Sequence, residues 1–240
     1  MLERYDRQIA VIGEEAQNKI LNTKVLVIGA GALGTSILNS LVRAGVGFIR
    51  VVDMDVVELS NLQRQMLFDE KDLGEKKVIA AVNKLKLINS QVELEPICDK
   101  ITTETISKYA VGCDIIIDAT DNFSTREIIN EYAVKNNLPW IYGGVAAAFG
   151  MAKTIIPKDT ACLKCFMKKK TNEEYTARNS GIINGITAVI GAIEANMAIR
   201  YIIGKPSTKL IYIDLFEDDF QTIEVKRDMN CPVCGGEKND

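Results

Sequence analysis

Short apolar runs alternate with amphipathic stretches through the first two thirds of this 240-residue chain. The runs are rich in Val and Ile and too short for ordinary helices, so they predict strands that are buried on both faces. The predicted strands are 25–28, 48–52, 92–97, 115–117, 140–143 and 152–156, and the predicted helices are 8–21, 32–44, 75–88 and 124–136. This alternation indicates an α/β fold with a Rossmann-like, mostly parallel sheet and helices on both faces.

The pattern changes after Pro157. Residues 158–180 are polar and contain a cysteine pair, and a helix of small residues is predicted over about 185–203. Two further apolar runs, 210–215 and 220–225, predict a C-terminal antiparallel pair. No repeat or low-complexity linker interrupts the chain. We therefore expect a single domain over 1–240, with a first half of residues 1–157 and a cysteine-bearing half of residues 158–240.

Charge and composition exclude several classes of function. The formal net charge is −3, so nothing in the overall charge favours a nucleic-acid partner, and the basic run 168–170 is typical of a solvated loop. No apolar stretch approaches the ~20 residues that span a bilayer, and the charged N-terminus lacks a signal-peptide core. These features predict a cytoplasmic protein. The chain has no histidine, which excludes Ser-His and Cys-His hydrolases.

A glycine-rich loop follows the first predicted strand and opens the helix over 32–44. Gly29 permits a tight turn, Gly31 lets the backbone approach a phosphate, and Gly34 lets the helix pack close to the sheet. Asp53 ends the next strand, where a carboxylate can accept hydrogen bonds from ribose hydroxyls. The loop predicts a nucleotide site rather than a turn selected only for packing. By itself it does not separate NAD from ATP.

Two cations beyond Asp53 favour a triphosphate over a dinucleotide. Arg64 and Lys77 can neutralise charge that a pyrophosphate in the loop does not carry. Asp121 follows the strand over 115–117, and a carboxylate at the carboxyl end of a parallel strand faces the ligand crevice. Such a carboxylate could hold Mg²⁺. Together these residues move the predicted chemistry from redox to adenylation.

Two CxxC pairs lie far apart in the sequence, Cys162 with Cys165 and Cys231 with Cys234. Four thiolates complete a closed tetrahedral Zn²⁺ site, which is structural because no position stays open for water. A lone CxxC could instead be a redox pair. The remaining cysteines, Cys98 and Cys113, adjoin apolar strands and are expected to be buried thiols.

Several ordered motifs resemble the ThiF/MoeB/HesA family, relatives of the ubiquitin-activating enzymes. The matching segments cover nearly the whole chain and are 4–8, 29–34, 53–55, 60–65, Lys77 and 120–122, followed by the two cysteine pairs. The resemblance implies that ATP and Mg²⁺ adenylate the C-terminal glycine of a small ubiquitin-like sulfur carrier ending in Gly-Gly. The pathway would be thiamine, molybdopterin or related sulfur-transfer biosynthesis, and the half 158–240 would bind the carrier.

The same resemblance implies roles for individual residues. Asp53 would bind ribose, with Asp55 also in the nucleotide site; Asn61, Arg64 and Lys77 would line the phosphate pocket, and Asp121 would bind Mg²⁺. Arg7 would reach the phosphates of a neighbouring subunit, which requires a homodimer. The usual zinc site of the family matches the four cysteines.

Two departures from the family pattern stand out. Many members carry a further cysteine in the loop before the helix over 185–203, and the matching position here is Ala177. This favours stopping at the adenylate and passing it to a separate sulfur donor. Gly150-Met151 replaces the Gly-Gln of the family, with no physical account from the sequence. The polar loop 166–180 is expected to be mobile near the carrier tail.

Three other functions are consistent with some of these motifs. A related dehydratase that activates a carboxylate on a modified tRNA base shares the ATP motifs, but tRNA favours a basic face. An NAD-dependent dehydrogenase explains the loop and Asp53 and leaves Arg64, Lys77 and Asp121 without a role. A zinc-stabilised dimeric scaffold without turnover explains the folding motifs alone.

Overall fold

The computed structural model describes residues 2–167 and 180–235, and in this part of the chain eight strands form one sheet. Their order across the sheet is β3-β2-β1-β4-β5-β6-β7-β8. The strands are β1 (Lys24–Ile28), β2 (Phe48–Val52), β3 (Glu93–Ile97), β4 (Ile115–Asp118), β5 (Trp140–Ala146), β6 (Phe149–Ile155), β7 (Leu210–Asp214) and β8 (Asp219–Ile223). Strands β1 to β5 pair in parallel, and β6, β7 and β8 extend the sheet antiparallel. The predicted fold class is confirmed.

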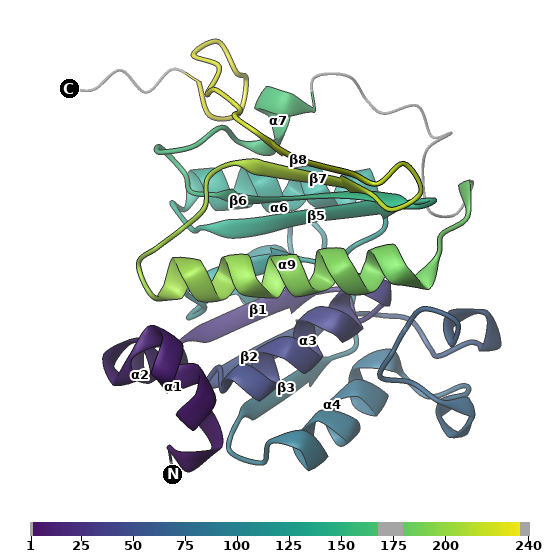
Figure 1. The fold of residues 1–240 in the computed structure, drawn as a ribbon. Coiled ribbons are helices and arrows are strands. Elements are labelled where there is room, and N and C mark those ends of the chain that lie inside the picture. The colour runs from purple at the N-terminus through teal and green to yellow at the C-terminus, as the bar shows by residue number, and fades with distance from the viewer. Residues whose placement is uncertain (1, 168–179, 236–240) are drawn as a thin grey trace.

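Helices cover both faces of this sheet (Figure 1). The α-helices are α1 (Asp6–Ile12), α2 (Glu14–Leu21), α3 (Ala32–Ala44), α4 (Lys77–Ile88), α5 (Ile106–Ala110), α6 (Phe123–Lys135), α7 (Leu163–Phe166) and α9 (Asn184–Ile202). Short 3₁₀ helices are η1 (Glu3–Tyr5), η2 (Leu59–Asn61) and η3 (Glu70–Asp72). Helices α3, α4 and α9 lie on the face toward the viewer in Figure 1, and α6 lies behind the sheet.

The apolar core has two parts because the parallel strands are buried on both faces. Val25 and Val27 of β1 pack with residues of α3, α4 and α9. Leu26 and Ile28 point to the other face and belong to a second apolar cluster, which also includes residues of α5 and α6 and the four cysteines of the two CxxC motifs. This alternation within one strand explains why β1 reads as a continuous apolar run.

Three predicted elements differ from the structure. The expected helix over 8–21 is two helices, because Gly13 between α1 and α2 adopts φ +85°, which a helix does not accommodate. The strands expected at 140–143 and 152–156 are each longer and form an antiparallel hairpin, β5 with β6. The β5 extension contains Gly144 and Ala146 and the β6 extension contains Gly150, and these small residues interrupt the apolar runs that predict a strand.

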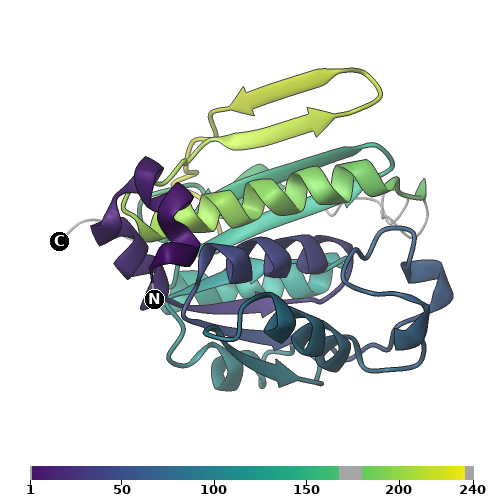
Figure 2. The ribbon, with the colours of Figure 1, turned by 60° about the horizontal axis from the view of Figure 1, so that its bottom comes forward.

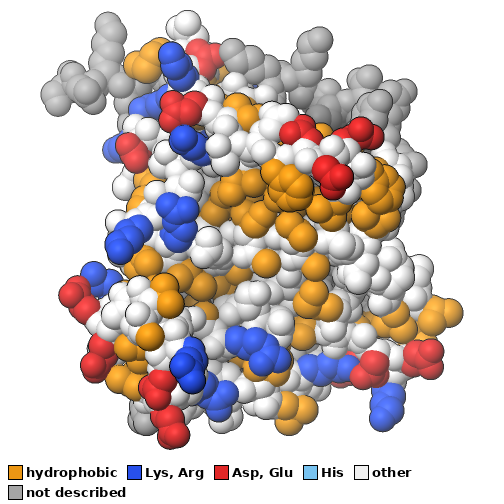
Figure 3. All heavy atoms as spheres, viewed as in Figure 1, with side chains coloured by type: hydrophobic (Ala, Val, Ile, Leu, Met, Phe, Trp, Pro, Cys, Tyr) orange, Lys and Arg blue, Asp and Glu red, His pale blue; other side chains and the backbone are white. Residues whose placement is uncertain are grey.

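The last two strands form a hairpin at the edge of the sheet (Figure 2). Several large side chains on and beside it are exposed, namely Phe216, Phe220 and Ile223. A band of hydrophobic side chains crosses the surface where β7 and β8 lie (Figure 3). An exposed apolar surface of this kind is typical of a contact with another protein.

None of the helices in the described ranges combines the length and the apolar character that crossing a membrane requires.

Candidate functional site

The glycine loop lies where the carboxyl ends of β1, β2 and β4 meet. The Gly29 amide donates to the Val52 carbonyl at 2.8 Å, and a Cβ on Gly29 would lie 2.5 Å from the Ala119 carbonyl oxygen. Gly29 also has φ +102°. Only glycine accommodates both constraints, so the sharp turn connects the ends of β2 and β4 through backbone contact.

The helix that follows packs as close to the loop as predicted. A Cβ on Gly34 would lie 2.1 Å from the Gly29 carbonyl oxygen, so α3 could not begin at this distance with any larger residue. The first amide groups of α3 therefore face the loop. Unpaired amide groups at a helix start, together with the helix dipole, favour a phosphate there.

Asp53 fixes the loop from the end of β2. Its carboxylate accepts hydrogen bonds from the amides of Ala30 at 2.7 Å and Asp55 at 2.8 Å. Burial raises the pKa of Asp53, and the nearby Lys77 ammonium and the two amides act against that rise. A carboxylate has about four acceptor sites, so Asp53 can hold the loop and still accept a bond from a ribose hydroxyl.

Lys77 lies beside Asp53 and Asp55 and is shielded from bulk solvent. It is the first residue of α4, and its side chain is only 8% exposed. Its ammonium forms an ion pair with the Asp55 carboxylate at 2.9 Å, and its backbone amide donates to the Asp55 carbonyl. The Asp55 side chain is 55% exposed. Because its partner Asp55 is half-exposed, the buried Lys77 cation could exchange that partner for a polyanion bound beside it.

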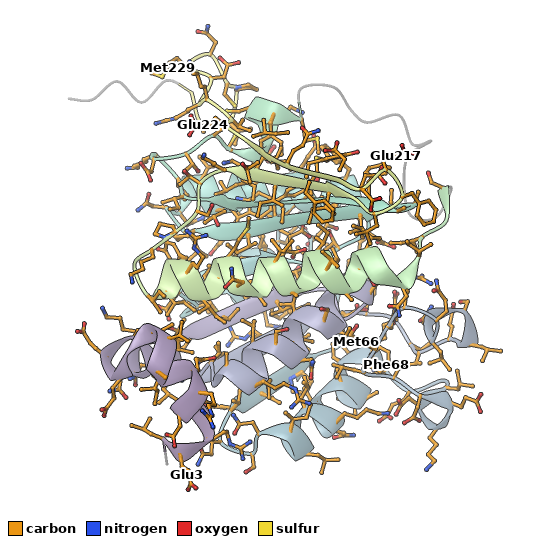
Figure 4. All side chains as sticks on the ribbon, viewed as in Figure 1. Glu3, Met66, Phe68, Glu217, Glu224 and Met229 are labelled. Carbon is orange, nitrogen blue, oxygen red and sulfur yellow. The ribbon has the colours of Figure 1, made fainter. Side chains whose placement is uncertain are left out.

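The predicted Asn61 and Arg64 lie on the segment between β2 and α4, which also carries Met66 and Phe68 (Figure 4). Asn61 is buried, and its side-chain oxygen accepts from the Glu58 amide at 3.2 Å, which closes the turn of η2. Arg64 is partly buried and donates to the Ser60 carbonyl at 3.0 Å. Asn61 and Arg64 thus stabilise the backbone of the segment between β2 and α4.

Gln65 is a site residue to which the sequence assigned no role. It is 3% exposed, and its side-chain nitrogen lies 3.7 Å from where a Cβ on Gly31 would stand. Its Oε1 is buried and accepts no hydrogen bond in the described residues. A buried acceptor without a partner beside a nucleotide loop is suited to a ligand donor. The only sequence signal was its position at the end of the Asn61–Gln65 run.

The segment after β4 contains one buried and one exposed carboxylate. Asp118 is fully buried and accepts from the Thr120 amide and hydroxyl, at 2.9 and 2.6 Å, and from Arg126 Nε at 3.1 Å. Asp121 is exposed, and its side chain forms no hydrogen bond or ion pair within the described residues. Asp118 thus holds the loop, while Asp121 remains available as an oxygen ligand.

Arg7 does not reach the nucleotide loop of its own chain. It is exposed on α1, next to Gln8, whose side chain donates to the Ala44 carbonyl at the end of α3. The loop lies at the start of α3, and a 13-residue helix is about 20 Å long. The structure brings together the glycine loop, Asp53, Asp55, Lys77 and Gln65, and leaves Arg7 at the opposite end of α3.

The two cysteine pairs converge, although 69 residues separate Cys162 from Cys231. All four sulfurs lie within 4.8 Å of one another and are buried. Three of the S–S distances are 3.9, 3.6 and 3.5 Å. Sulfurs bound at 2.3 Å to one tetrahedral ion would be about 3.8 Å apart, so the cluster fits Zn²⁺. The segment from Glu224 to Met229, labelled in Figure 4, leads from β8 to the second pair.

The remaining cysteines differ from each other. Cys113 is buried, as predicted, and burial raises its pKa. The prediction that Cys98 is buried is wrong: Cys98 is exposed. It follows β3, which is the edge strand of the sheet, so no neighbouring strand covers it.

A buried carboxylic acid, Glu194, lies on α9 against Gly143 of β5. It is fully buried, and neither oxygen has a hydrogen-bond partner in the described residues. A Cβ on Gly143 would lie 1.7 Å from its Oε1, so the carboxyl group fills the space that this glycine leaves. Burial raises the pKa of Glu194 well above its ordinary value; Asp118 adds to the rise, and Arg126 opposes it.

We expect the variant Glu194→Gln to melt at a higher temperature than the wild type, by more at pH 8 than at pH 5. The unfolded chain ionises this group above its ordinary pKa of about 4.3, whereas the fold retains the proton, so wild-type stability falls as pH rises through this window. Glutamine cannot ionise. Calorimetric scans at the two pH values measure the difference, and an equal shift at both would contradict the expectation.

Comparison with known proteins decides the family. Residues 5–233 of the chain match the ThiF family. The chain belongs to the ThiF family.

Its relatives in this family include named enzymes. The chain is 36% identical over 243 residues to the sulfur carrier protein ThiS adenylyltransferase of Bacillus subtilis, covering 98% of this chain and 72% of the relative. It is 34% identical over 248 residues to the sulfur carrier protein adenylyltransferase of Thermus thermophilus, covering 98% and 92%. A crystal structure of E. coli MccB with ATP matches 97% of this ThiF-family chain and 74% of MccB, with a TM-score of 0.85 and 26% identity.

These relatives confirm the family resemblance and the prediction of an adenylyltransferase. Ala177, the basic run 168–170 and most of the loop 166–180 lie outside the described residues, so the predictions about them stay predictions.

Proposed function

We propose that this chain uses ATP and Mg²⁺ to adenylate the C-terminal glycine carboxylate of a small ubiquitin-like sulfur carrier ending in Gly-Gly. The observation that carries the proposal is the buried Lys77 beside the glycine loop, in a chain whose named relatives are sulfur carrier adenylyltransferases. A dinucleotide carries only a pyrophosphate in the glycine loop and does not require a further cation such as Lys77 beside it. The pathway would be thiamine, molybdopterin or related sulfur-transfer biosynthesis.

Each site residue has a role in this reaction. The Gly29, Gly31 and Gly34 loop would hold phosphates on the first amides of α3, and Asp53 would bind the ribose hydroxyls. Lys77 would exchange its partner Asp55 for the phosphates, and Arg64 would join it. Asn61 would line the phosphate pocket, and Gln65 Oε1 would accept a hydrogen bond from the ligand.

The chemistry needs no general base. The carrier carboxylate is already an anion; its oxygen attacks the α-phosphorus, the bond to the β-phosphate breaks, and pyrophosphate leaves. The main obstacle is repulsion between the carboxylate and the polyphosphate, which fixed cations reduce. Asp121, which is exposed and has no partner among the described residues, would hold Mg²⁺, which when bound neutralises phosphate charge.

We further propose a homodimer in which Arg7 serves the site of the other subunit. Its position at the far end of α3 from its own loop supports this arrangement. Ala177 in place of a cysteine supports transfer of the adenylate to a separate sulfur donor. Residues 1–157 would form the nucleotide-binding half and residues 158–240 the zinc-bound, carrier-binding half.

The four cysteines would hold a structural Zn²⁺. The fit of the S–S distances to a tetrahedron supports this assignment, and with four thiolates no position is left for water. The ion would fasten the C-terminal tail to α7.

ATP–pyrophosphate exchange tests the function. Purified protein with ATP, Mg²⁺ and candidate carriers is expected to exchange labelled pyrophosphate only with a carrier whose final glycine is present. The matched control is the same carrier without that residue. No exchange with any carrier would contradict the proposal, and ATP binding without adenylate formation would support the scaffold reading.

The other enzyme readings are tested in parallel. Salt-sensitive binding of tRNA would support the dehydratase, and stabilisation against heat by NAD in place of ATP–Mg²⁺ would support the dehydrogenase.

A further inference from the structure

Two basic side chains are built into the surroundings of the cysteine cluster. The first is Lys153 on β6, which is fully buried. Met151 and Ile155 flank it on the same face of the strand; Ile155 belongs to the apolar cluster that contains the four cysteines, and Met151 packs against that cluster. The Lys153 ammonium donates to the Thr208 carbonyl, the only hydrogen bond found for it in the described residues. Burial lowers the pKa of Lys153 to about 8, and the charges of Cys165 and of the exposed Glu224 act against that fall.

The second is Arg227, on the segment between β8 and the second cysteine pair. Its guanidinium donates to the Cys234 carbonyl and, at 2.7 Å, to the Lys158 carbonyl. Its Nε is buried without a hydrogen-bond acceptor among the described residues. The cation is thus held by neutral carbonyls against the backbone of a cysteine ligand.

The negative charge of a zinc-bound cysteine cluster would explain why Lys153 and Arg227 lie in its surroundings. Four thiolates around one Zn²⁺ carry a net charge of −2, and a buried anion of that size requires compensation. Lys153 and Arg227 supply two positive charges that oppose this negative charge. Neutral donors complete the surroundings: Asn130 Nδ2 lies 3.8 Å from Cys162 Sγ, and the Asp228 amide lies 3.5 Å from Cys165 Sγ.

We propose that Lys153 and Arg227 are positioning residues of the metal site, which compensate the charge of the four thiolates and so set its affinity for Zn²⁺. The inference rests on the proposed zinc site. A purely structural lysine is a poor alternative, because burying an ammonium against one carbonyl costs more than an apolar residue would between Met151 and Ile155.

Zinc affinity of the full chain, measured by competition with a chromophoric chelator, tests the proposal. Lys153→Met and Arg227→Gln are each expected to weaken zinc binding by about 10–100-fold, the usual loss for a residue that supports metal ligands. Lys153→Arg retains the charge and is expected to recover most of the affinity. The matched control is Lys164→Met, which lies between the ligands Cys162 and Cys165 but pairs with Glu127 at 3.1 Å; we expect wild-type affinity.

The outcomes separate this inference from the proposed zinc site. Wild-type protein that holds no zinc would overturn both. Wild-type protein that holds zinc, with Lys153→Met and Arg227→Gln equal to it in affinity, would overturn only the role of the two cations. If Lys153→Met does not fold, Arg227→Gln and Lys153→Arg still decide the question, since unchanged affinity in Arg227→Gln contradicts the charge argument.

Discussion

Replacing Lys77 with methionine is expected to lower carrier-dependent ATP–pyrophosphate exchange by about 10²–10³-fold, the loss typical of a group that stabilises developing charge in a closed site. Methionine retains most of the length and apolar volume of the buried stem and removes only the ammonium. The carboxylates of Asp53 and Asp55 then remain without the Lys77 ammonium that lies near both of them. An incoming triphosphate would meet net negative charge.

The neighbouring lysine provides a matched control. Lys76 precedes α4 as its N-cap and is exposed, so Lys76→Met makes the same chemical change one position away and is expected to leave exchange unchanged. Thermal unfolding without nucleotide should be similar for both variants, because the Asp55 partner of Lys77 is half-exposed and such pairs contribute little to stability. Full exchange activity in Lys77→Met would remove the main support for a triphosphate site.

The backbone geometry of the glycine loop was predictable from the sequence because glycine acts there by steric exclusion. A Cβ at Gly29 or Gly34 would lie only 2.5 Å or 2.1 Å from a backbone carbonyl oxygen, so a side chain is excluded at both positions, and the spacing between them encodes the turn. The position of Asp53 at a strand end was predictable because it directly follows the apolar run 48–52. These are local relations, and local relations leave a pattern in the sequence.

Long-range pairings left no such pattern. The ion pair of Lys77 with Asp55 and the orphan oxygen of Gln65 depend on where the segment between β2 and α4 folds back, which apolar periodicity does not determine. Glu194 is buried where Gly143, on a strand far away in the sequence, leaves room for its carboxyl group, a contact that the sequence pattern does not encode. Cys98 was misassigned because an apolar run does not tell an edge strand from a central one.

The cysteine cluster was the exception, since residue type alone specified a long-range contact. Two distant CxxC pairs are expected to lie together when they share a metal ion or exchange disulfides. The structure places their sulfurs at distances that fit one ion. This makes the cluster the part of the fold whose removal should cost the most.

Cys162→Ser is therefore expected to lose zinc and to lower the melting temperature sharply. Structural zinc contributes about 10–16 kcal/mol of apparent binding free energy in small zinc domains, which is comparable to the whole stability of an ordinary domain. The loss should be largest for the C-terminal tail, which follows β8 and which the site fastens to α7. A strong chelator should produce the same destabilisation in the wild type.

The control for this variant is Cys98→Ser, the same substitution at an exposed thiol outside the cluster. It is expected to retain one zinc per chain by elemental analysis and the wild-type melting temperature. In Cys162→Ser three thiolates remain and the fourth ligand is a weaker oxygen donor, so a chelator should remove any residual zinc quickly. If Cys162→Ser instead retains both metal and melting temperature, the four sulfurs meet for a reason other than zinc, and the C-terminal tail must be held by its apolar contacts alone.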